Sequence, residues 1–273
     1  IGIATNQINI IVTTILATGT VLGAVSWLTY AFRLFQFPVG IISVSIAGSN
    51  LVHFSEKWKA GEYNEAKNLL KTSYLLSFFT IVPACALLYG LARESVHLVF
   101  ERGAFSVSDT IMTTEALYFY LVGLPFYGLY KIFAPTFFTL DRPKVPVFIS
   151  VASISLNIIF CILMTPEYGF SILALGTSLS MIFNCFLQII FLRKYLDLDL
   201  DFFFDRRLFK ILLAGTCCLA LTKYLSQIFF HYDHAFAQKA FTFCLIGFSG
   251  AACYGIILLV LGEKSALKQI LRK

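Results

Sequence analysis

Apolar residues in this chain form long uninterrupted runs, several of them long enough to cross a membrane. About twenty apolar residues in an α-helix span the hydrocarbon layer of a bilayer. When single charges inside a run are allowed, the pattern predicts eight spans, at approximately 3–22, 27–52, 72–91, 116–140, 145–164, 168–192, 208–230 and 240–261. No strand-like alternation of apolar and polar residues supports a barrel. The predicted fold is therefore all-α, a polytopic membrane helical bundle of about eight transmembrane helices.

Composition supports this prediction, because 58% of the 273 residues are hydrophobic, only 13% are charged, and the mean hydropathy is +0.81. Soluble globular proteins lie far from these values. The chain begins at Ile1 with neither Met nor a basic stretch before the first apolar run. We therefore do not read the first run as a signal peptide, and we expect the chain to be part of a longer protein.

Basic residues outside the spans are distributed unevenly between the two sides of the predicted bundle. Positive loops stay on the cytoplasmic side. Three basic residues fall on one side, Arg93, Arg102 and Lys239, whereas the other side carries Lys57, Lys59, Lys67, Lys71, Arg142, Lys144, Arg193, Lys194, Arg206, Arg207, Lys210, Lys264, Lys268, Arg272 and Lys273. This asymmetry predicts that both ends of the chain are cytoplasmic. The net charge of +6 then lies beside anionic lipid headgroups and does not indicate nucleic acid.

Two segments interrupt the apolar pattern. The acidic and basic stretch at 197–207 separates the first six spans, within residues 1–196, from the last two, within residues 197–273. Interleaved opposite charges between Glu56 and Lys71 predict a short surface helix.

Signatures of catalysis are missing from the sequence, which contains no P-loop, nucleophile elbow or HExxH motif. All seven cysteines lie in apolar runs without the spacing of a metal site or a disulfide framework. We expect no enzyme activity, no metal and no cofactor.

Three basic residues, Arg33, Lys131 and Lys223, lie inside the apolar runs, whereas none of the fifteen acidic residues does. A cation inside the hydrocarbon costs roughly 2.5 to 3.5 kcal/mol unless it reaches the interface, pairs, or faces a polar cavity. With no carboxylate at the same depth, an anionic ligand is a candidate partner. For Lys223, near the end of its span, snorkelling to the interface is the preferred interpretation.

The second span carries a polar stripe around Arg33. Ser26, Tyr30 and Arg33 recur at helical spacing, and Gln36 is adjacent. Pro38 lacks an amide donor and predicts a helix break beside the guanidinium, whose planar fork of donors suits phosphate oxygens. These residues are candidates for binding an anionic substrate, with snorkelling or structural pairing of Arg33 as the alternative.

The fourth span places Lys131 between Pro125 and Pro135, deep in the membrane. Broken or bent helices near the midplane expose polar backbone to substrates in many transporters. We therefore predict that the helix is broken or bent at these two prolines. We also predict a cavity-lining role for Lys131, with hydrogen bonding between helices as the alternative.

At these same residues the chain resembles the lipid II flippase MurJ (MviN) family of the multidrug/oligosaccharidyl-lipid/polysaccharide (MOP) exporter superfamily. Four stretches carry the resemblance: NQINIIVTTILATG from Asn6, YAFRLFQFPVGI from Tyr30, the segment near 61–71, and KIFAPTFFTLDRPKVP from Lys131. The resemblance implies two six-helix lobes and a final helix pair that forms a groove for the lipid tail. Residues 1–196 would then be the second lobe, residues 197–273 the terminal pair, and the N-terminal lobe would be missing.

The resemblance also implies a role in cell-wall synthesis, as part of a flippase that moves an undecaprenyl-pyrophosphate precursor of peptidoglycan across the bacterial inner membrane by alternating access. Arg33 matches the family's cavity arginine and would bind pyrophosphate, and Lys131 matches the lysine before Ala-Pro and would assist. The expected partners are the polyprenyl-pyrophosphate lipid, membrane lipids and the missing lobe. Phe32, Thr13 and Gln36 stand where many relatives have acidic residues, which puts cation coupling at those positions in doubt.

Two alternatives remain. A cation-coupled drug or polysaccharide exporter of the same superfamily would need an acidic cavity in the missing lobe. A non-transporting membrane scaffold would bind the lipid without moving it.

Overall fold

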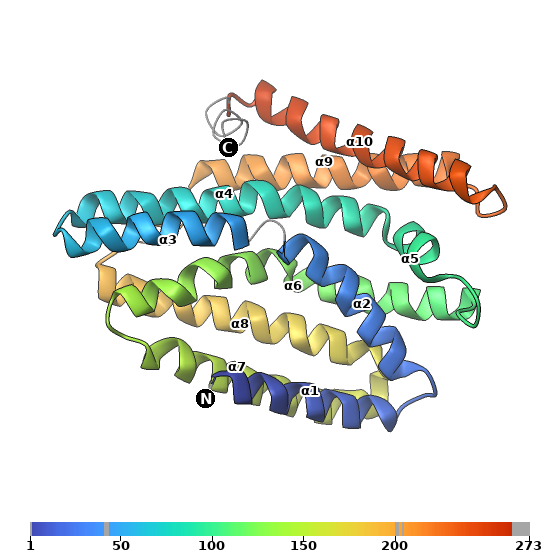
Figure 1. Cartoon of the computed structure of the whole chain (residues 1–273), viewed down its shortest axis with the longest axis horizontal. Helices are drawn as coiled ribbons and strands as arrows, with labels where there is room; N and C mark the ends of the chain where they lie inside the picture. The colour runs from blue at the N-terminus through green and yellow to red at the C-terminus, as the bar shows by residue number, and fades with distance from the viewer. Residues whose placement is uncertain (1, 41–43, 200–201, 204, 264–273) are drawn as a thin grey trace.

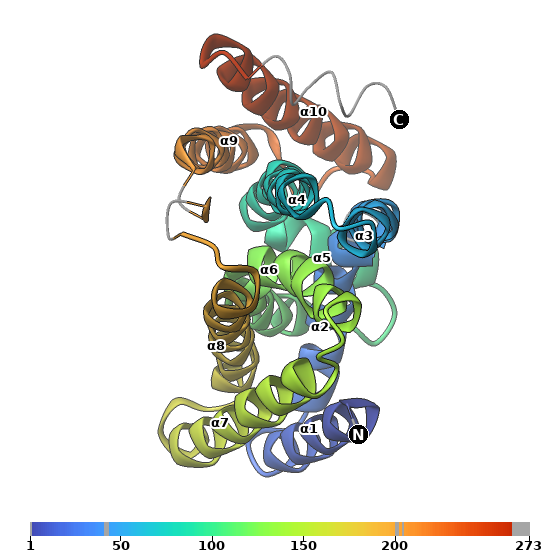
Figure 2. The same ribbon diagram turned by 90° about the vertical axis from the view of Figure 1, so that its left-hand side faces the viewer.

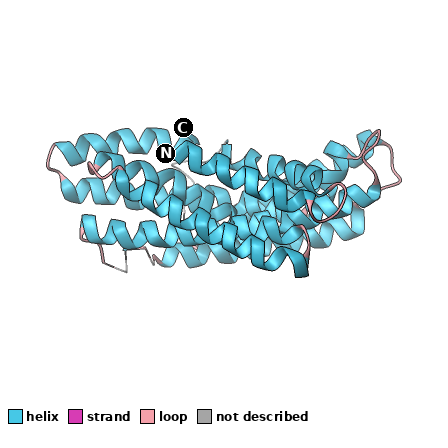
Figure 3. Cartoon of the chain, turned by 90° about the horizontal axis from the view of Figure 1, so that it is seen from below, coloured by secondary structure: helices cyan, strands magenta, loops and turns pink. Residues whose placement is uncertain are grey.

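The computed structural model describes residues 2–40, 44–199, 202–203 and 205–263. Within these residues the chain forms ten helices and no strand, which confirms the all-α prediction (Figure 3). Their bounds are α1 Gly2–Thr18, α2 Ala24–Pro38, α3 Val44–Lys59, α4 Tyr63–Gly90, α5 Ala92–Phe100, α6 Val107–Thr139, α7 Lys144–Tyr168, α8 Ser171–Leu196, α9 Arg206–Phe229 and α10 Phe236–Val260.

The helices lie along one common direction and stack in layers (Figures 1 and 2). From one side of the bundle to the other, α10 and α9 are followed by α4 with α3, then by α6 with α2, then by α8, and finally by α7 with α1. Six of the described helices, α4 and α6 to α10, are long and apolar enough to cross a membrane. The chain is a multi-pass membrane protein.

The predicted span at 27–52 consists of two helices, because α2 ends at Pro38 and α3 begins at Val44. The predicted helix break at Pro38 is confirmed. Proline lacks the amide that would continue the hydrogen-bond ladder. In Figure 1, α2 and α3 occupy opposite halves of the bundle, so together they make one crossing.

Two further predictions about local structure are corrected. The segment from Glu56 to Lys71 is not a separate surface helix, because α3 runs to Lys59 and α4 starts at Tyr63 after a tight turn. Lys57 fastens this turn through ion pairs with Glu62 and Glu65. The short amphipathic helix α5 was not predicted, since nine residues are too few to stand out as an apolar run.

Helix α6 continues through Pro125 and Pro135, so the expectation of a break at these residues is wrong and the expectation of a bend is confirmed (Figure 1). Its 33 residues correspond to a length of about 50 Å. Figure 1 shows the helix bowed along its length rather than interrupted. A proline is tolerated inside a membrane helix when neighbouring groups take up the freed carbonyl.

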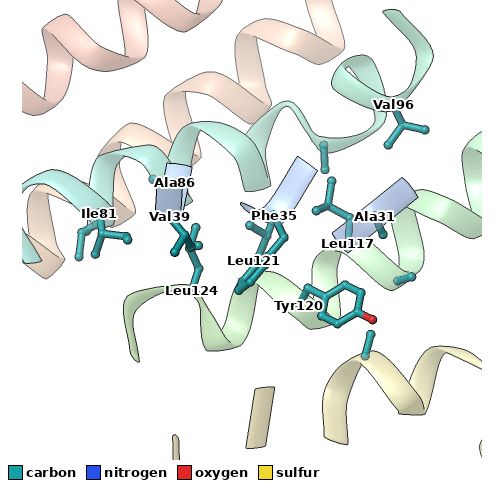
Figure 4. Packing of buried hydrophobic residues seen from close by; sticks show 14 of the residues in the cluster. Ala31, Phe35, Val39, Ile81, Ala86, Val96, Leu117, Tyr120, Leu121 and Leu124 are labelled. Carbon is teal, nitrogen blue, oxygen red and sulfur yellow. The ribbon is translucent and has the colours of Figure 1, made fainter. Parts of the chain in front are cut away.

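The largest apolar cluster lies where α2, α4 and α6 meet, and Figure 4 shows its packing. Ala31 and Phe35 of α2 point at Leu117, Leu121 and other residues of α6, and all four side chains are at most 1% exposed. This cluster fixes α2 against α6, and both helices contribute to the site described below.

The α9–α10 hairpin covers α4 on the side away from α6 (Figure 2). Close packing depends on small residues, because a Cβ atom at Gly215 would collide with Val82 of α4. The Tyr254 hydroxyl of α10 donates to the carbonyl of Phe79 at 2.9 Å. Near the start of α4, Lys71 forms an ion pair with Asp205, the N-cap of α9, at 3.0 Å.

The predicted division of the chain into a six-helix lobe, residues 1–196, and a terminal helix pair, residues 197–273, stays a prediction.

Candidate functional site

A cavity of about 520 Å³ lies among α1, α2, α6, α7 and α8. Figure 2 shows these helices as neighbours in the part of the bundle remote from α10. Most of the side chains that line it are polar, and these are Asn9, Thr13, Thr14, Thr29, Gln36, Tyr120, Tyr127, Tyr130, Lys131, Ser150, Ser153, Thr177, Ser180 and Asn184. The cavity is thus rich in hydroxyl and amide groups.

Lys131 is the one charged residue among the described residues that line the cavity. It lies eight residues before the end of α6 at Thr139, a distance of about 12 Å along the helix. No carboxylate belongs to the described lining. The site is therefore electropositive, and Lys131 together with the amide and phenol groups can donate to an anionic or strongly polar guest. Five of the lining hydroxyl groups already donate to carbonyls of their own helices, those of Thr14, Thr29, Ser153, Thr177 and Ser180.

The wall formed by α6 and α8 follows from helical spacing. Tyr120 and Tyr127 are seven residues apart on α6, which places them two turns apart on the same face. Thr177, Ser180 and Asn184 recur every three or four residues on α8 and line the same hollow. Neither row is among the predicted binding residues, although a count of polar residues at helical spacing would have found both.

A hydrogen bond between asparagines closes the opposite wall. Asn157 of α7 donates from Nδ2 to Asn9 Oδ1 of α1 at 2.7 Å. Cys161 lies one turn further along α7, and its thiol donates to Asn157 Oδ1 at 3.4 Å. Helix α8 reaches this pair only because Gly176 has no side chain, since a Cβ atom there would lie 2.6 Å from Asn157 Oδ1. Neutral amides, and no ion pair, therefore connect α1 to α7 at this point.

The predicted binding residues of α2 are divided between two faces. Gln36 lines the cavity together with Thr29 and Phe32. Arg33 is turned by about 100° from Phe32, as one residue step of an α-helix requires, and it does not line this cavity. Its guanidinium lies 5.8 Å from the centre of the Tyr30 ring. Ser26 is exposed on the same side of the helix as Arg33.

Tyr30 positions this second face of α2. Its ring packs against Phe100 of α5, with 4.8 Å between ring centres, and against Phe105 in the following loop at 5.4 Å. One turn earlier, Trp27 Nε1 donates to Asp109 Oδ1 of α6 at 2.7 Å. The end of α2 that is remote from Pro38 is therefore fixed, and Arg33 projects from a rigid support. The roles of Arg33, Tyr30 and Ser26 in binding stay predictions.

No group of three or more His, Cys, Asp or Glu side chains within the described part of the chain is arranged to hold a metal ion. The site can bind through charge and hydrogen bonds, and it contains no nucleophile paired with a base among its described lining residues.

A family model, sequence relatives and solved structures all point to the same protein family. The family model described as lipid II flippase MurJ matches residues 1–247. A probable lipid II flippase MurJ of Rhizobium meliloti is 33% identical over 165 residues, which cover 60% of this chain and 31% of the relative. The corresponding protein of Vibrio cholerae is 29% identical over 269 residues, covering 96% of this chain and 50% of the relative. The chain thus spans half or less of the length of these relatives.

Solved structures with the same fold include a lipid II flippase MurJ in an inward closed conformation. The likeness has a TM-score of 0.73 at 24% identity and covers 94% of this chain and 53% of that one. An outward-facing multidrug resistance MATE family transporter of the MOP superfamily gives a TM-score of 0.64 at 14% identity, covering 94% of this chain and 61% of the other. These structures agree with the matched model, and the chain belongs to the lipid II flippase MurJ family.

Proposed function

We propose that this chain is part of a flippase that carries an undecaprenyl-pyrophosphate-linked peptidoglycan precursor across the bacterial inner membrane by alternating access. The match of the family model to residues 1–247 carries this proposal. The polar cavity supports it, because a single ammonium without a described carboxylate fits a pyrophosphate group better than it fits a cation.

Within this proposal the chain supplies the second lobe of the transporter, residues 1–196, and a terminal pair, α9 and α10. Both ends of the chain face the cytoplasm, as the distribution of Lys and Arg predicts. The exposed face of α2 that carries Arg33 and Ser26 turns toward the rest of the full-length protein, and the pyrophosphate lies between that face and Lys131. The two lobes rock against each other around this anion.

Arg33→Ala in the full-length protein tests the role of α2. We expect loss of growth when this variant is the only copy in cells depleted of their own flippase, because a bidentate contact to the pyrophosphate is removed. Lipid II translocation, measured by labelling of lipid II on the outer leaflet, should fall at least tenfold.

Arg33→Lys distinguishes charge from geometry and should restore part of the activity. Arg102→Ala provides a matched control, because Arg102 is an exposed arginine at the loop between α5 and α6. Normal growth and translocation with Arg33→Ala would remove Arg33 from the mechanism.

A further inference from the structure

A buried polar network joins α5 to the α9–α10 hairpin, far from the cavity. Glu94 of α5 is only 8% exposed. Its Oε1 atom accepts hydrogen bonds from Ser226 Oγ of α9 at 2.6 Å and from the Tyr232 hydroxyl at 3.1 Å. The guanidinium of Arg93 lies over the Tyr232 ring, 4.8 Å from its centre. The loop after α9 is thereby held against α5.

His97 lies one turn further along α5 and connects two groups of opposite charge. Its Nε2 atom is 2.9 Å from Lys239 Nζ of α10, and its Nδ1 atom is 2.8 Å from Glu101 Oε2. The contact with Glu101 is short but poorly aligned for a hydrogen bond. Lys239 also donates to the carbonyl of Tyr232 at 3.2 Å. With a side chain only 9% exposed, His97 sits between the two helices.

This geometry fixes the protonation of the imidazole. An ammonium group has donors only, so Nε2 must present a lone pair to Lys239, and the ring proton is assigned to Nδ1, which faces Glu101. A second proton on the ring would point an N–H at the ammonium and bring two positive charges within 2.9 Å. We propose that His97, Lys239 and Glu101 form a pH-sensitive latch, which holds α10 to α5 while the imidazole is neutral and releases Lys239 when it is protonated.

Charged and titratable groups from several neighbouring elements surround the latch and the adjacent Glu94. They are Arg93, Glu94 and Glu101 around α5, Tyr89 of α4, Tyr118 of α6, Tyr232 in the loop, and Lys239 of α10. Burial acts to raise the pKa of Glu101, but the Thr110 hydroxyl, His97 and Lys239 together hold that pKa below its usual range. Glu101 therefore stays ionised under mildly acidic conditions.

An ionised Glu101 determines the direction of the switch. The protonated imidazole strengthens its pairing with Glu101 and repels Lys239, so His97 keeps its contact with Glu101 and loses the one with Lys239. The latch is therefore closed while the imidazole is neutral and opens when acidification protonates it. Because the contacts all lie within this chain, the inference does not depend on the substrate proposed above.

Hydrogen exchange measured by mass spectrometry tests the latch in the full-length protein in lipid nanodiscs. At pH 5.5, compared with pH 7.5 and after correction for intrinsic exchange rates, protection of the first two turns of α10 should fall roughly tenfold. Helix α7 should not respond. His97→Gln, whose amide cannot gain a proton, should keep the same protection at both pH values.

Two further variants make the result decisive. Lys239→Met removes the donor, so α10 should exchange rapidly at both pH values even if His97→Gln folds poorly. His231→Gln is the matched control, because His231 is exposed in the neighbouring loop, and the response of the wild-type protein should persist. Equal protection at both pH values in the wild-type protein, or a response that survives in both His97→Gln and Lys239→Met, would overturn the proposal.

Discussion

Full-length protein carrying Lys131→Met is expected to lose lipid II translocation almost completely. Methionine keeps the length of the side chain but removes the one charge among the described residues that line the cavity. A hydrogen bond to a charged group contributes about 1.5–3 kcal/mol, which corresponds to roughly 10- to 100-fold in binding of an anionic headgroup. Translocation at low lipid II concentration should fall by that factor, measured in proteoliposomes with fluorescent lipid II.

Controls separate this effect from misfolding. Lys223→Met alters another lysine within a membrane helix, but Lys223 projects from α9 outside the cavity, so transport should stay close to wild type. Lys131→Arg restores the charge and should recover part of the activity. If Lys131→Met transports normally while its melting temperature is unchanged, the cavity does not bind the pyrophosphate.

The second large effect is expected at Gly123, where α6 packs closely against α8. A Cβ atom at this position would lie 2.9 Å from the Cα atom of Ser178 and 2.8 Å from its Oγ atom. That hydroxyl donates to the carbonyls of Phe119 at 2.7 Å and Tyr120 at 3.1 Å. Gly123→Ala therefore cannot be absorbed by rotation of a side chain, and it must move α8 away from α6.

Overpacking of this kind costs about 1–3 kcal/mol, so the apparent melting temperature of Gly123→Ala in detergent should be about 3–8 °C lower. Gly255→Ala is the matched control, because a Cβ atom at Gly255 of α10 has no neighbour within 4 Å among the described atoms. That variant should melt at or slightly above the wild-type temperature, since alanine favours a helix. Equal melting of the two variants would show that the α6–α8 contact is looser than the structure indicates.

Much of the fold could be predicted from the sequence because the bilayer imposes a minimum length on each apolar run. Helices α7 and α10 agree with predicted spans to within a few residues at most boundaries. The presence of a proline predicted the helix break correctly at Pro38 but not at Pro125 or Pro135. Pro38 ends a helix inside an apolar run, whereas Pro125 and Pro135 do not, and nothing in the surrounding composition distinguishes these cases.

The site was predicted only in part. The position of Lys131 deep inside an apolar run identified it as a residue that lines the cavity. The sequence contained no information about where the Arg33 side chain points, because this depends on how α2 is rotated about its axis against α6. The hydrogen-bond partners of Glu94 could not be predicted either, because Ser226 and Tyr232 are 132 and 138 residues away in sequence. Contacts between residues so far apart in sequence become visible only in the three-dimensional structure.

The close fit of α9 against α4 has a consequence for the design of chimeras. Gly215 of α9 leaves room for Val82 of α4, and Gly90 of α4 leaves room for Thr222 of α9. Each helix thus has a glycine where the other has a larger side chain. A terminal hairpin transplanted from a relative would bring its own pattern of small and large residues and would clash with this one. Exchange of α9 and α10 between family members should therefore succeed only when the matching face of α4 is exchanged with them.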